Sequence, residues 1–466
     1  MRPATRREFL KQSASTAAIA IGFPTIVPAS VFGQNAPSNR INIGAIGVGR
    51  ISRGHDMPGV FQYTGDAGPR NNRIVAVCDL DQNRVELGKK FVNGTYAKKL
   101  GKDYNGTVGY SNHRELLANS DIDAVIISTP DHQHARLAID AVRARKDVYL
   151  QKPASLTIHE GRVMVDHVNA TDRILQIGSQ QRCWKQFVRA CELVRNGRIG
   201  EVQRVEIGLP GDPSGGDPTP MPVPAGFNYD AWLGSTPEVP YTVDRVMPRD
   251  SFDRPGWLRM EQFGAGMITG WGAHHVDTAH WGMDTEHTGP VEIWGSAEFP
   301  THGLWNVHGP FKTYGRYANG VEMTISGDFP NGIKWYGTKG WIFVTRDGMA
   351  SPTAKPGDPA PNIVPLQASD PKILTSVIGP NELHLYTSDE QHGNWLDCIR
   401  SRKAPVAPAE LGHRACSTCL LHHIAMKTRR RLHWDPEAEC FKGDDAANAM
   451  LSRPQRKPYQ IDDAKV

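Results

Sequence analysis

The sequence predicts an α/β domain followed by an α+β domain: a doubly wound parallel sheet, then a larger C-terminal domain on a mostly antiparallel open sheet. Three observations predict this. Short apolar runs alternate with amphipathic helical stretches between residues 41 and 153. A glycine-rich turn follows the first of these runs. After about residue 200, strand-like runs follow one another with turns and few helices between them.

The first domain is built from buried strands and amphipathic helices in alternation. Strands are predicted at 41–46, 73–78, 124–129 and 147–152, with helices at 82–91 and 134–146 between them. Continuous apolar runs of this length are typical of parallel strands covered on both faces, joined by right-handed crossovers. The pattern continues through a helix near 157–171 and a run at 174–179.

The second domain lacks this alternation. Strand-like runs lie at 202–210, 291–299, 312–327 and 339–347, which predicts an antiparallel sheet. Pro- and Gly-rich loops at 211–262 and 349–380 are longer than plain connections require, and such loops commonly shape a substrate pocket. Helices are predicted again at 394–403 and 413–431, before an extended tail.

The first 33 residues are typical of a twin-arginine signal peptide. Arg6 and Arg7 precede a short alanine-rich apolar stretch, and small residues follow near a cleavage site. A membrane anchor is the alternative, but Pro24 breaks the apolar stretch, which is too short to span a bilayer. The sequence therefore predicts export to the periplasm of an already folded protein, with no membrane association once the signal is cleaved.

Charge does not indicate a nucleic acid partner or an acidic lipid surface. The whole chain carries a formal charge of +4. Its first 33 residues hold four basic residues and one acid, and removing this +3 leaves about +1. A mature protein so close to neutrality is expected to bind small molecules rather than polyanions.

The seven cysteines are an odd number, scattered along the chain, and form no disulfide framework. Cys416 and Cys419 form a CxxC close to His422 and His423, which suggests zinc. However, the segment reads as one helix and no second CxxC exists. We therefore expect these cysteines to be small core residues and expect no metal site.

The first strand runs directly into a dinucleotide-binding turn. Gly47 and Gly49 occupy the first two positions of GxGxxG, and Arg50 and Ile51 lead to Ser52, where the third glycine usually stands. Such glycines permit a tight turn and the close approach of a pyrophosphate to a helix N-terminus. Asp79, at the end of the second strand, is suited to the adenosine ribose. An acid here favours NAD over NADP, although NADP stays possible.

Two further motifs follow predicted strands at the edge of the sheet where ligands bind. Thr129-Pro130-Asp131-His132-Gln133-His134 follows one, and Gln151-Lys152-Pro153 follows the next. With the glycine turn, they resemble the Gfo/Idh/MocA oxidoreductases, whose landmarks are GxGxxG, TPxxxH and EKP. The resemblance extends from about residue 40 to the C-terminus, and Gln151 departs from it by replacing the glutamate. It assigns Thr129, Pro130, His134, Gln151 and Lys152 to the cofactor site.

The stretch GAGMITGWGAHHVD, residues 264–277, is too glycine-rich for a stable isolated helix and indicates close approach of the backbone to another group. It is similar to the family's GGGxxxDxGxH segment. That similarity implies Lys152 and His274 as catalytic residues, but the family's aspartate position holds Gly270. Chemically, a neutral imidazole suits proton abstraction from a hydroxyl, and a lysine cation stabilises the developing alkoxide.

Other residues near these motifs have alternative interpretations. His275 and Asp277 can contact substrate, but His275 is favoured as a structural hydrogen-bonding residue and Asp277 can equally anchor the glycine-rich loop. Arg182 and Trp184, just past the run at 174–179, can line the pocket or simply begin a helix. A zinc site from His274, His275 and Asp277 is conceivable but fits the glycines less well.

The predicted domain order is a signal peptide at 1–33, an NAD(P)-binding Rossmann domain at 40–155, a substrate and oligomerisation domain at 156–390, and C-terminal helices and tail at 391–466 packing back on the core. The resemblance implies a carbohydrate substrate and a homodimer or homotetramer. Three functions compete: a sugar or polyol oxidoreductase with tightly bound cofactor, a redox-neutral NAD-dependent glycosidase or lyase, and a non-catalytic sugar-binding protein.

Overall fold

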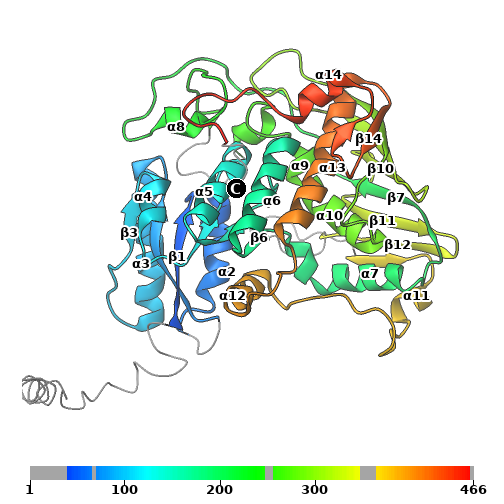
Figure 1. Cartoon of the computed structure of the whole chain (residues 1–466), viewed down its shortest axis with the longest axis horizontal. Coiled ribbons are helices and arrows are strands. Elements are labelled where there is room, and N and C mark those ends of the chain that lie inside the picture. The colour runs from blue at the N-terminus through cyan, green and yellow to red at the C-terminus, as the bar shows by residue number, and fades with distance from the viewer. Residues whose placement is uncertain (1–38, 66–69, 247–254, 347–363, 462–466) are drawn as a thin grey trace, which may run out of the picture.

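The computed structural model describes residues 39–65, 70–246, 255–346 and 364–461. The predicted signal peptide, residues 1–33, lies outside these ranges. Figure 1 shows two sheets side by side, with helices packed between them and against them. Within the described ranges, no helix is both long enough and apolar enough to cross a membrane.

The N-terminal sheet is six-stranded and parallel, in the order β3-β2-β1-β4-β5-β6. The predicted doubly wound sheet is thus confirmed. Its strands are β1 (Ile41–Ile46), β2 (Asn72–Cys78), β3 (Val108–Tyr110), β4 (Ala124–Ile127), β5 (Asp147–Leu150) and β6 (Leu175–Ile177). Only β3 escaped prediction, because this short edge strand is partly exposed and has no apolar run.

Helices cover both faces of this sheet. They comprise the π-helical turn η3 (Ser52–Asp56), α2 (Met57–Phe61), α3 (Gln82–Leu100), α4 (His113–Ala118), the 3-10 turn η4 (Asp131–Gln133), α5 (His134–Arg143) and α6 (Ile158–Thr171). Alternate residues of β1 point to opposite faces: Ile43 belongs to one apolar cluster and Ile46 to another. The strands are therefore buried from both sides, as their continuous apolar runs predicted.

The second sheet has nine strands in the order β13-β12-β11-β7-β10-β9-β8-β14-β15, and only β10 and β7 pair in parallel. The prediction of a mostly antiparallel sheet is confirmed. Its strands are β7 (Val202–Gly208), β8 (Glu292–Ala297), β9 (Phe311–Arg316), β10 (Glu322–Ser326), β11 (Gly332–Gly337), β12 (Gly340–Val344), β13 (Leu366–Ala368), β14 (Leu432–Asp435) and β15 (Cys440–Phe441). The long run at 312–327 is a hairpin, and β14 and β15 arise from the predicted tail.

The remaining helices pack mainly on one face of this sheet and between the two sheets (Figure 1). They are η5 (Gln180–Cys183), α7 (Lys185–Arg195), α8 (Tyr229–Leu233), η6 (Gly256–Arg259), α9 (Met267–Gly270), α10 (Gly272–Met283), α11 (Pro371–Thr375), α12 (Gln391–Ser401), α13 (Ala409–Thr428), α14 (Asp445–Asn448) and η7 (Ala449–Leu451). Helix α13 contacts α6 from the first domain and α10 from the second.

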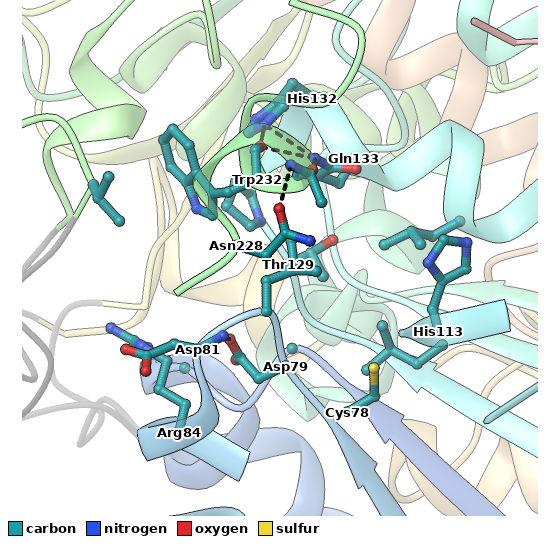
Figure 2. Close-up of a pocket in the computed structure, with 18 of the residues that line it drawn as sticks. Cys78, Asp79, Asp81, Arg84, His113, Thr129, His132, Gln133, Asn228 and Trp232 are labelled. Atoms are coloured by element: carbon teal, nitrogen blue, oxygen red, sulfur yellow. Dashed lines mark hydrogen bonds between the residues drawn. The ribbon is translucent and has the colours of Figure 1, made fainter. Parts of the chain in front are cut away.

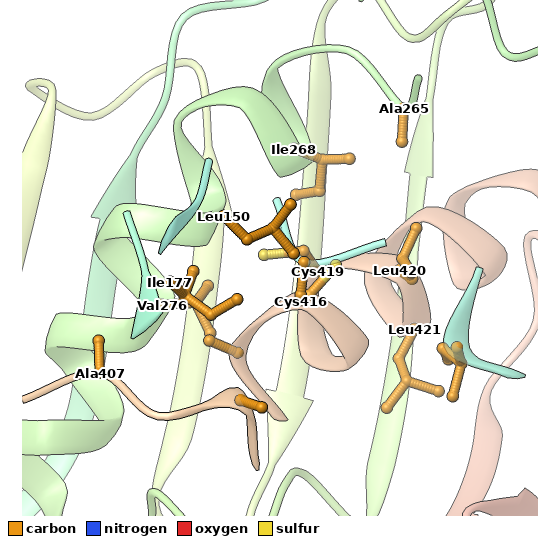
Figure 3. Close-up of a cluster of buried hydrophobic side chains, with 14 of the residues drawn as sticks. Leu150, Ile177, Ala265, Ile268, Val276, Ala407, Cys416, Cys419, Leu420 and Leu421 are labelled. Atoms are coloured by element: carbon orange, nitrogen blue, oxygen red, sulfur yellow. The ribbon is translucent and has the colours of Figure 1, made fainter. Parts of the chain in front are cut away.

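The glycine-rich stretch forms helices α9 and α10, although its composition argued against an isolated helix. Tertiary packing provides the stability, because every residue of α10 up to Gly282 is buried. The glycines allow close approach: a Cβ on Gly272 would lie 3.1 Å from Cys419 Sγ. Cys416 and Cys419 pack inside the core beside Ile268 and Val276 (Figure 3), which confirms them as core residues.

The predicted boundary at residue 155 divides the parallel sheet, because β6 is its sixth strand. The first domain therefore extends beyond Ile177, and we correct the boundary accordingly. Helix α12 returns to this domain, with Trp395 completely buried beside Tyr149. The C-terminal segment thus packs against both domains.

Candidate active site

The glycine turn lies at the carboxyl end of β1. Gly47 has φ +83°, and its N–H donates to the carbonyl of Cys78 at 2.8 Å. A Cβ on Gly47 would lie 2.8 Å from the backbone oxygen of Ser128, so only glycine fits here. Helical backbone begins directly after Gly49, at Arg50 and Ile51. The free N–H groups of a helix start beside this turn suit a pyrophosphate.

A cavity of about 780 Å³ follows this edge of the sheet, within the size range of ligand sites. Gly47, Gly49, Arg50 and Ile51 line it, and Asp79 lies on the same wall (Figure 2). The Asp79 carboxylate accepts the N–H groups of Val48 and Asp81 at 2.8 and 3.1 Å. Burial raises the pKa of Asp79, and the nearby Arg84 opposes that shift. Asp79 thus lies beside the turn, where a ribose would be bound.

The TPDHQH motif forms the next part of the wall. Thr129 and Pro130 line the cavity as predicted, but His134 does not. Its two ring nitrogens lie 2.6 and 2.9 Å from the carbonyl oxygens of Pro153 and Thr129. We therefore correct its assignment from cofactor contact to a buried residue that joins the two motif segments.

Gln151 and Lys152 line the cavity at the end of β5. The ammonium nitrogen Nζ of Lys152 donates to the carbonyl oxygen of Gly270 at 2.8 Å. Lys152 belongs to the parallel domain, whereas Gly270 ends α9 in the second domain. The two predicted catalytic segments are thus in direct contact.

His274 lies in the first turns of α10, four residues after Gly270, and its side chain is buried. Its Nδ1 has no hydrogen-bond partner within the described part of the chain. Burial, then the nearby cations Arg346 and Lys152, hold the pKa of His274 well below its usual value. The imidazole is therefore neutral at physiological pH and can accept a proton or a hydrogen bond.

Asp131 is a site residue that belongs to the TPDHQH motif but was not predicted to have a role in the site. It lines the cavity and is only 3% exposed, and its Oδ2 has no hydrogen-bond partner in the described structure. Burial raises the pKa of Asp131 to about 7, against the opposing charge of Lys152. A carboxyl group at this pKa can hold or release a proton near neutral pH. The third position of TPDHQH was the available signal for it.

Two residues that were predicted to contact substrate instead bind each other inside the fold. Arg182 makes a bidentate ion pair with Asp277, with both distances 2.8 Å, and also pairs with Glu286. Arg182 and Asp277 are almost completely buried and do not line the cavity. We correct their assignment: they fix η5 against α10, as the anchoring interpretation of Asp277 anticipated.

The remaining two candidates differ from each other. His275 is fully buried, and its Nε2 lies 2.9 Å from Oδ1 of Asn331, the structural role that the sequence favoured. Trp184 is partly exposed, and the Arg346 guanidinium lies 4.6 Å from its ring centroid. Because Arg346 also lowers the pKa of His274, Trp184 lies near His274, but neither side chain lines the cofactor cavity. Arg346 lies two residues after the end of β12 and had no sequence signal.

A loop of the second domain closes over the cavity; we call residues 224–235 the strap. The N–H of Gln82 donates to Gly226 O and the N–H of Asn228 to Leu80 O, both at 2.9 Å. Gln133 Nε2 donates to Trp232 O at 2.9 Å (Figure 2). Pro458 and Tyr459 from the C-terminal tail also line the cavity. A ligand there would lie between the two domains, beside the hydrogen bonds that join the strap to the first domain.

We expect Asp230→Ala to accelerate cofactor loss about three- to tenfold. Asp230 accepts from the Tyr459 hydroxyl at 2.6 Å and pairs with Arg456, so it holds the tail on the strap. The pair is exposed, which limits the effect. Dissociation of bound nucleotide, followed by fluorescence, measures this. Glu238→Ala is the control, because Glu238 pairs with the same Arg456 at 3.3 Å and is more exposed than Asp230; equal rates in both variants would refute a role for Asp230.

The cavity fits a dinucleotide by its own chemistry. The glycines of the turn permit the close approach of a pyrophosphate, and the helix start offers it N–H groups. Asp79 lies where a ribose would be recognised. Asp79 would repel a 2′-phosphate, which favours NAD. When bound, NAD would supply the hydride acceptor. Gly47, Gly49, Arg50 and Ile51 would hold its pyrophosphate, Asp79 its ribose, and Thr129, Pro130, Gln151 and Lys152 its other end.

Comparison with known proteins agrees with this fit. The model of an oxidoreductase family's NAD-binding Rossmann fold (GFO_IDH_MocA) matches residues 41–179. The model of the C-terminal alpha/beta domain of that family matches residues 216–348 and 380–461. Together the two models cover more than half of the chain and both domains.

Individual relatives are more distant. Over 183 residues the chain is 28% identical to myo-inositol 2-dehydrogenase of Thermotoga maritima, covering 39% of this chain and 47% of that protein. Over 174 residues it is 30% identical to alpha-N-acetylgalactosaminidase of Shewanella oneidensis, covering 37% and 36%. The matches thus span less than half the length of these curated relatives.

A solved structure shows the same fold over most of its length. The aldose-aldose oxidoreductase from Caulobacter crescentus, complexed with glycerol, superposes with a TM-score of 0.57 at 18% identity. The match covers 84% of this chain and 99% of that one.

Proposed function

Because the chain belongs to the Gfo/Idh/MocA oxidoreductase family, we propose that it oxidises a hydroxyl-bearing carbon of a sugar or polyol, or reduces the corresponding carbonyl, with bound NAD. The contact between Lys152 and the segment that carries His274 is the observation behind this proposal. It brings a cation that lines the cofactor cavity close to a neutral imidazole of the second domain, which lies behind the cavity wall. Oxidation of an alcohol requires that pair of groups.

Each side chain has a distinct role in the proposed reaction. Lys152 donates a hydrogen bond to the substrate oxygen and stabilises the negative charge that develops there. His274 accepts the hydroxyl proton at Nδ1, the atom without a hydrogen-bond partner in the described structure. Asp131, beside Lys152 and with a pKa near 7, holds or releases a proton there and so takes over part of the role of the acid missing at Gly270.

The strap supports a cofactor that stays bound between turnovers. Strap and tail residues line the same cavity as the glycine turn, and their interdomain contacts would slow the release of NAD. A retained cofactor must be reoxidised by a second substrate at the same site. We therefore propose a cycle in which one sugar reduces the bound cofactor and another reoxidises it.

Protein purified without added nucleotide is expected to contain NAD or NADH at close to one equivalent. Mass spectrometry of the denatured protein measures this. Adding a reactive sugar should then change the absorbance of the nicotinamide near 340 nm without free NAD. An empty protein that also fails to bind added NAD would contradict the proposal and favour a sugar-binding role.

Redox-neutral cleavage of a glycoside is a second candidate. The resemblance to an alpha-N-acetylgalactosaminidase and the absence of an acid at Gly270 favour it. In such a cycle, oxidation of a ring hydroxyl to a ketone acidifies the neighbouring C–H bond, and loss of that proton eliminates the aglycone. Water then adds to the double bond that has formed, and the ketone is reduced back to the hydroxyl. A chromogenic glycoside panel without added nucleotide distinguishes the two: release of aglycone supports cleavage, and interconversion of free sugars supports the oxidoreductase.

We propose export through residues 1–33 and assembly through the second sheet. Arg6 and Arg7 support export, and cell fractionation of the full chain would measure it. The outer sheet surface carries a stacked pair, Trp294 and Tyr314, with the Arg431 guanidinium 3.7 Å from the Trp294 ring centroid. Such an aromatic and cationic surface suits a homodimer or homotetramer, which light scattering would measure.

A further inference from the structure

A buried carboxylate behind the glycine turn has no part in the mechanism above. Asp56 ends the π-helical turn η3 and is 0% exposed. The wider helical turn is confined to Ser52–Asp56, and the backbone continues as α2 from Met57. Single π-helical turns within helices frequently occur at functional sites.

Asp56 accepts hydrogen bonds from the residue before one strand-end motif and from the first residue of the other. Ser128 Oγ donates to Oδ2 at 2.6 Å, and Ser128 is followed by Thr129. Gln151 Nε2 donates to Oδ1 at 2.7 Å, and Gln151 is followed by Lys152. One carboxylate therefore links the helix after the glycine turn to the carboxyl ends of β4 and β5, three of the segments that form the cofactor site.

Two histidines complete the cluster around Asp56. His55 Nδ1 lies 2.8 Å and His392 Nε2 3.5 Å from Oδ1, and His392 Nδ1 lies 2.6 Å from Glu390 Oε1. Burial alone would raise the pKa of Asp56, but the contacts with His392 and His55 hold it below its usual range. Burial likewise opposes charge on His392, yet Glu390 and Asp56 raise its pKa to about 9. Asp56 is therefore ionised.

The position of this charge explains Gln151, the residue that departs from the EKP motif. A glutamate at 151 would place a second carboxylate against Asp56, where the present contact is 2.7 Å. Two ionised carboxylates at so short a distance in a buried site repel each other strongly. A glutamine instead donates its amide to Asp56, so the negative charge lies at residue 56 rather than at residue 151.

We propose that Asp56 is a positioning residue that replaces the glutamate of EKP and holds Lys152 and Thr129 in place around the cofactor. This inference rests on the proposed function, in which Lys152 contacts the reacting oxygen. His55, Asp56 and His392 are also the one group of three potential metal ligands among the described residues. The atoms of these side chains that face one another already form hydrogen bonds and ion pairs. We therefore assign the three residues to the ionic cluster around Asp56 rather than to a metal site.

Exchanging the two residues tests the proposal. Asp56→Asn and Gln151→Glu should each lower kcat about 10- to 100-fold, the usual effect of removing a supporting contact, with little change in KM for the sugar. The double variant D56N/Q151E restores one carboxylate and one amide at the same contact. Its kcat should return to within about fivefold of the wild-type value, a recovery that a merely structural role would not produce.

Asp147→Asn is the matched control. Asp147 is a buried carboxylate at the opposite end of β5, where it pairs with Arg402 at 2.7 Å. This variant should lower the thermal midpoint but leave kcat per folded molecule unchanged, and Q151E should not rescue it. Wild-type kcat in D56N, or a double variant no more active than its single parents, would overturn the proposal.

Cofactor retention separates this inference from the proposed function. If the wild-type protein retains NAD but converts no sugar, the proposed function fails. The NAD content of the four proteins then tests Asp56 by itself, with low content expected in both single variants and recovery in the double variant. Equal NAD content in all four proteins, without any activity difference, would refute the role of Asp56.

Discussion

Replacing Lys152 by methionine is expected to lower kcat about 100- to 1,000-fold and leave NAD bound. Methionine keeps most of the side-chain volume but removes the cation that stabilises the developing alkoxide. It also removes the hydrogen bond to Gly270 O, the contact between the two domains at the site. Steady-state kinetics with the reactive sugar, together with NAD content by mass spectrometry, measure both effects.

Lys185→Met is the control for this variant. Lys185 is exposed at the start of α7, so its loss changes the net charge equally without touching the cofactor cavity. It should leave kcat unchanged. Normal activity in the Lys152 variant would exclude Lys152 from the chemistry, whereas loss of NAD would show that it mainly binds cofactor.

Replacing His274 by asparagine is expected to lower kcat about 100- to 10,000-fold, the range for removing a general base. Burial and the cations Arg346 and Lys152 keep the imidazole neutral, so it can accept the substrate proton. Asparagine is polar and similar in size but cannot accept a proton at neutral pH. The NAD content and the thermal midpoint should change little, because Nδ1 has no hydrogen-bond partner in the described structure.

The adjacent histidine provides the control. His275 is buried and bound to Asn331, so His275→Asn should cost about 1–3 kcal/mol in the free energy of unfolding. Its kcat per folded molecule should stay within about fivefold of wild type. Thermal melts and kinetics on both variants check this contrast. If the two variants lose activity to the same extent, His274 has no special role as base.

Local sequence was sufficient for much of the fold and for the main cofactor motifs. The continuous apolar runs of β1, β4 and β5 specified strands buried on both faces. Gly47 was recognisable from the GxG spacing directly after β1, and its positive φ of +83° explains why the tight turn requires glycine there. These features depend on short-range geometry, which leaves a signature in neighbouring residues.

Sequence was insufficient wherever a role depends on distant partners. Arg182 and Asp277 resembled pocket residues until the fold paired them with each other. The helix α10 contradicted its composition, because packing against α13 and α7 stabilises a glycine-rich segment that would not persist alone. No local sequence pattern indicates which of several polar side chains will form hydrogen bonds or ion pairs with one another inside the folded protein.

The sequence by itself determined the main alternation of strands and helices in the first domain, the glycine turn and the family, because each depends on residue types at fixed spacing. Only the tertiary structure placed Lys152 against the His274 segment, closed the strap over the cavity and gathered Ser128 and Gln151 around Asp56. These arrangements join residues that are far apart in the chain. Their hydrogen bonds and ion pairs exist only after the two domains have packed together, and spacing along the sequence does not encode that packing.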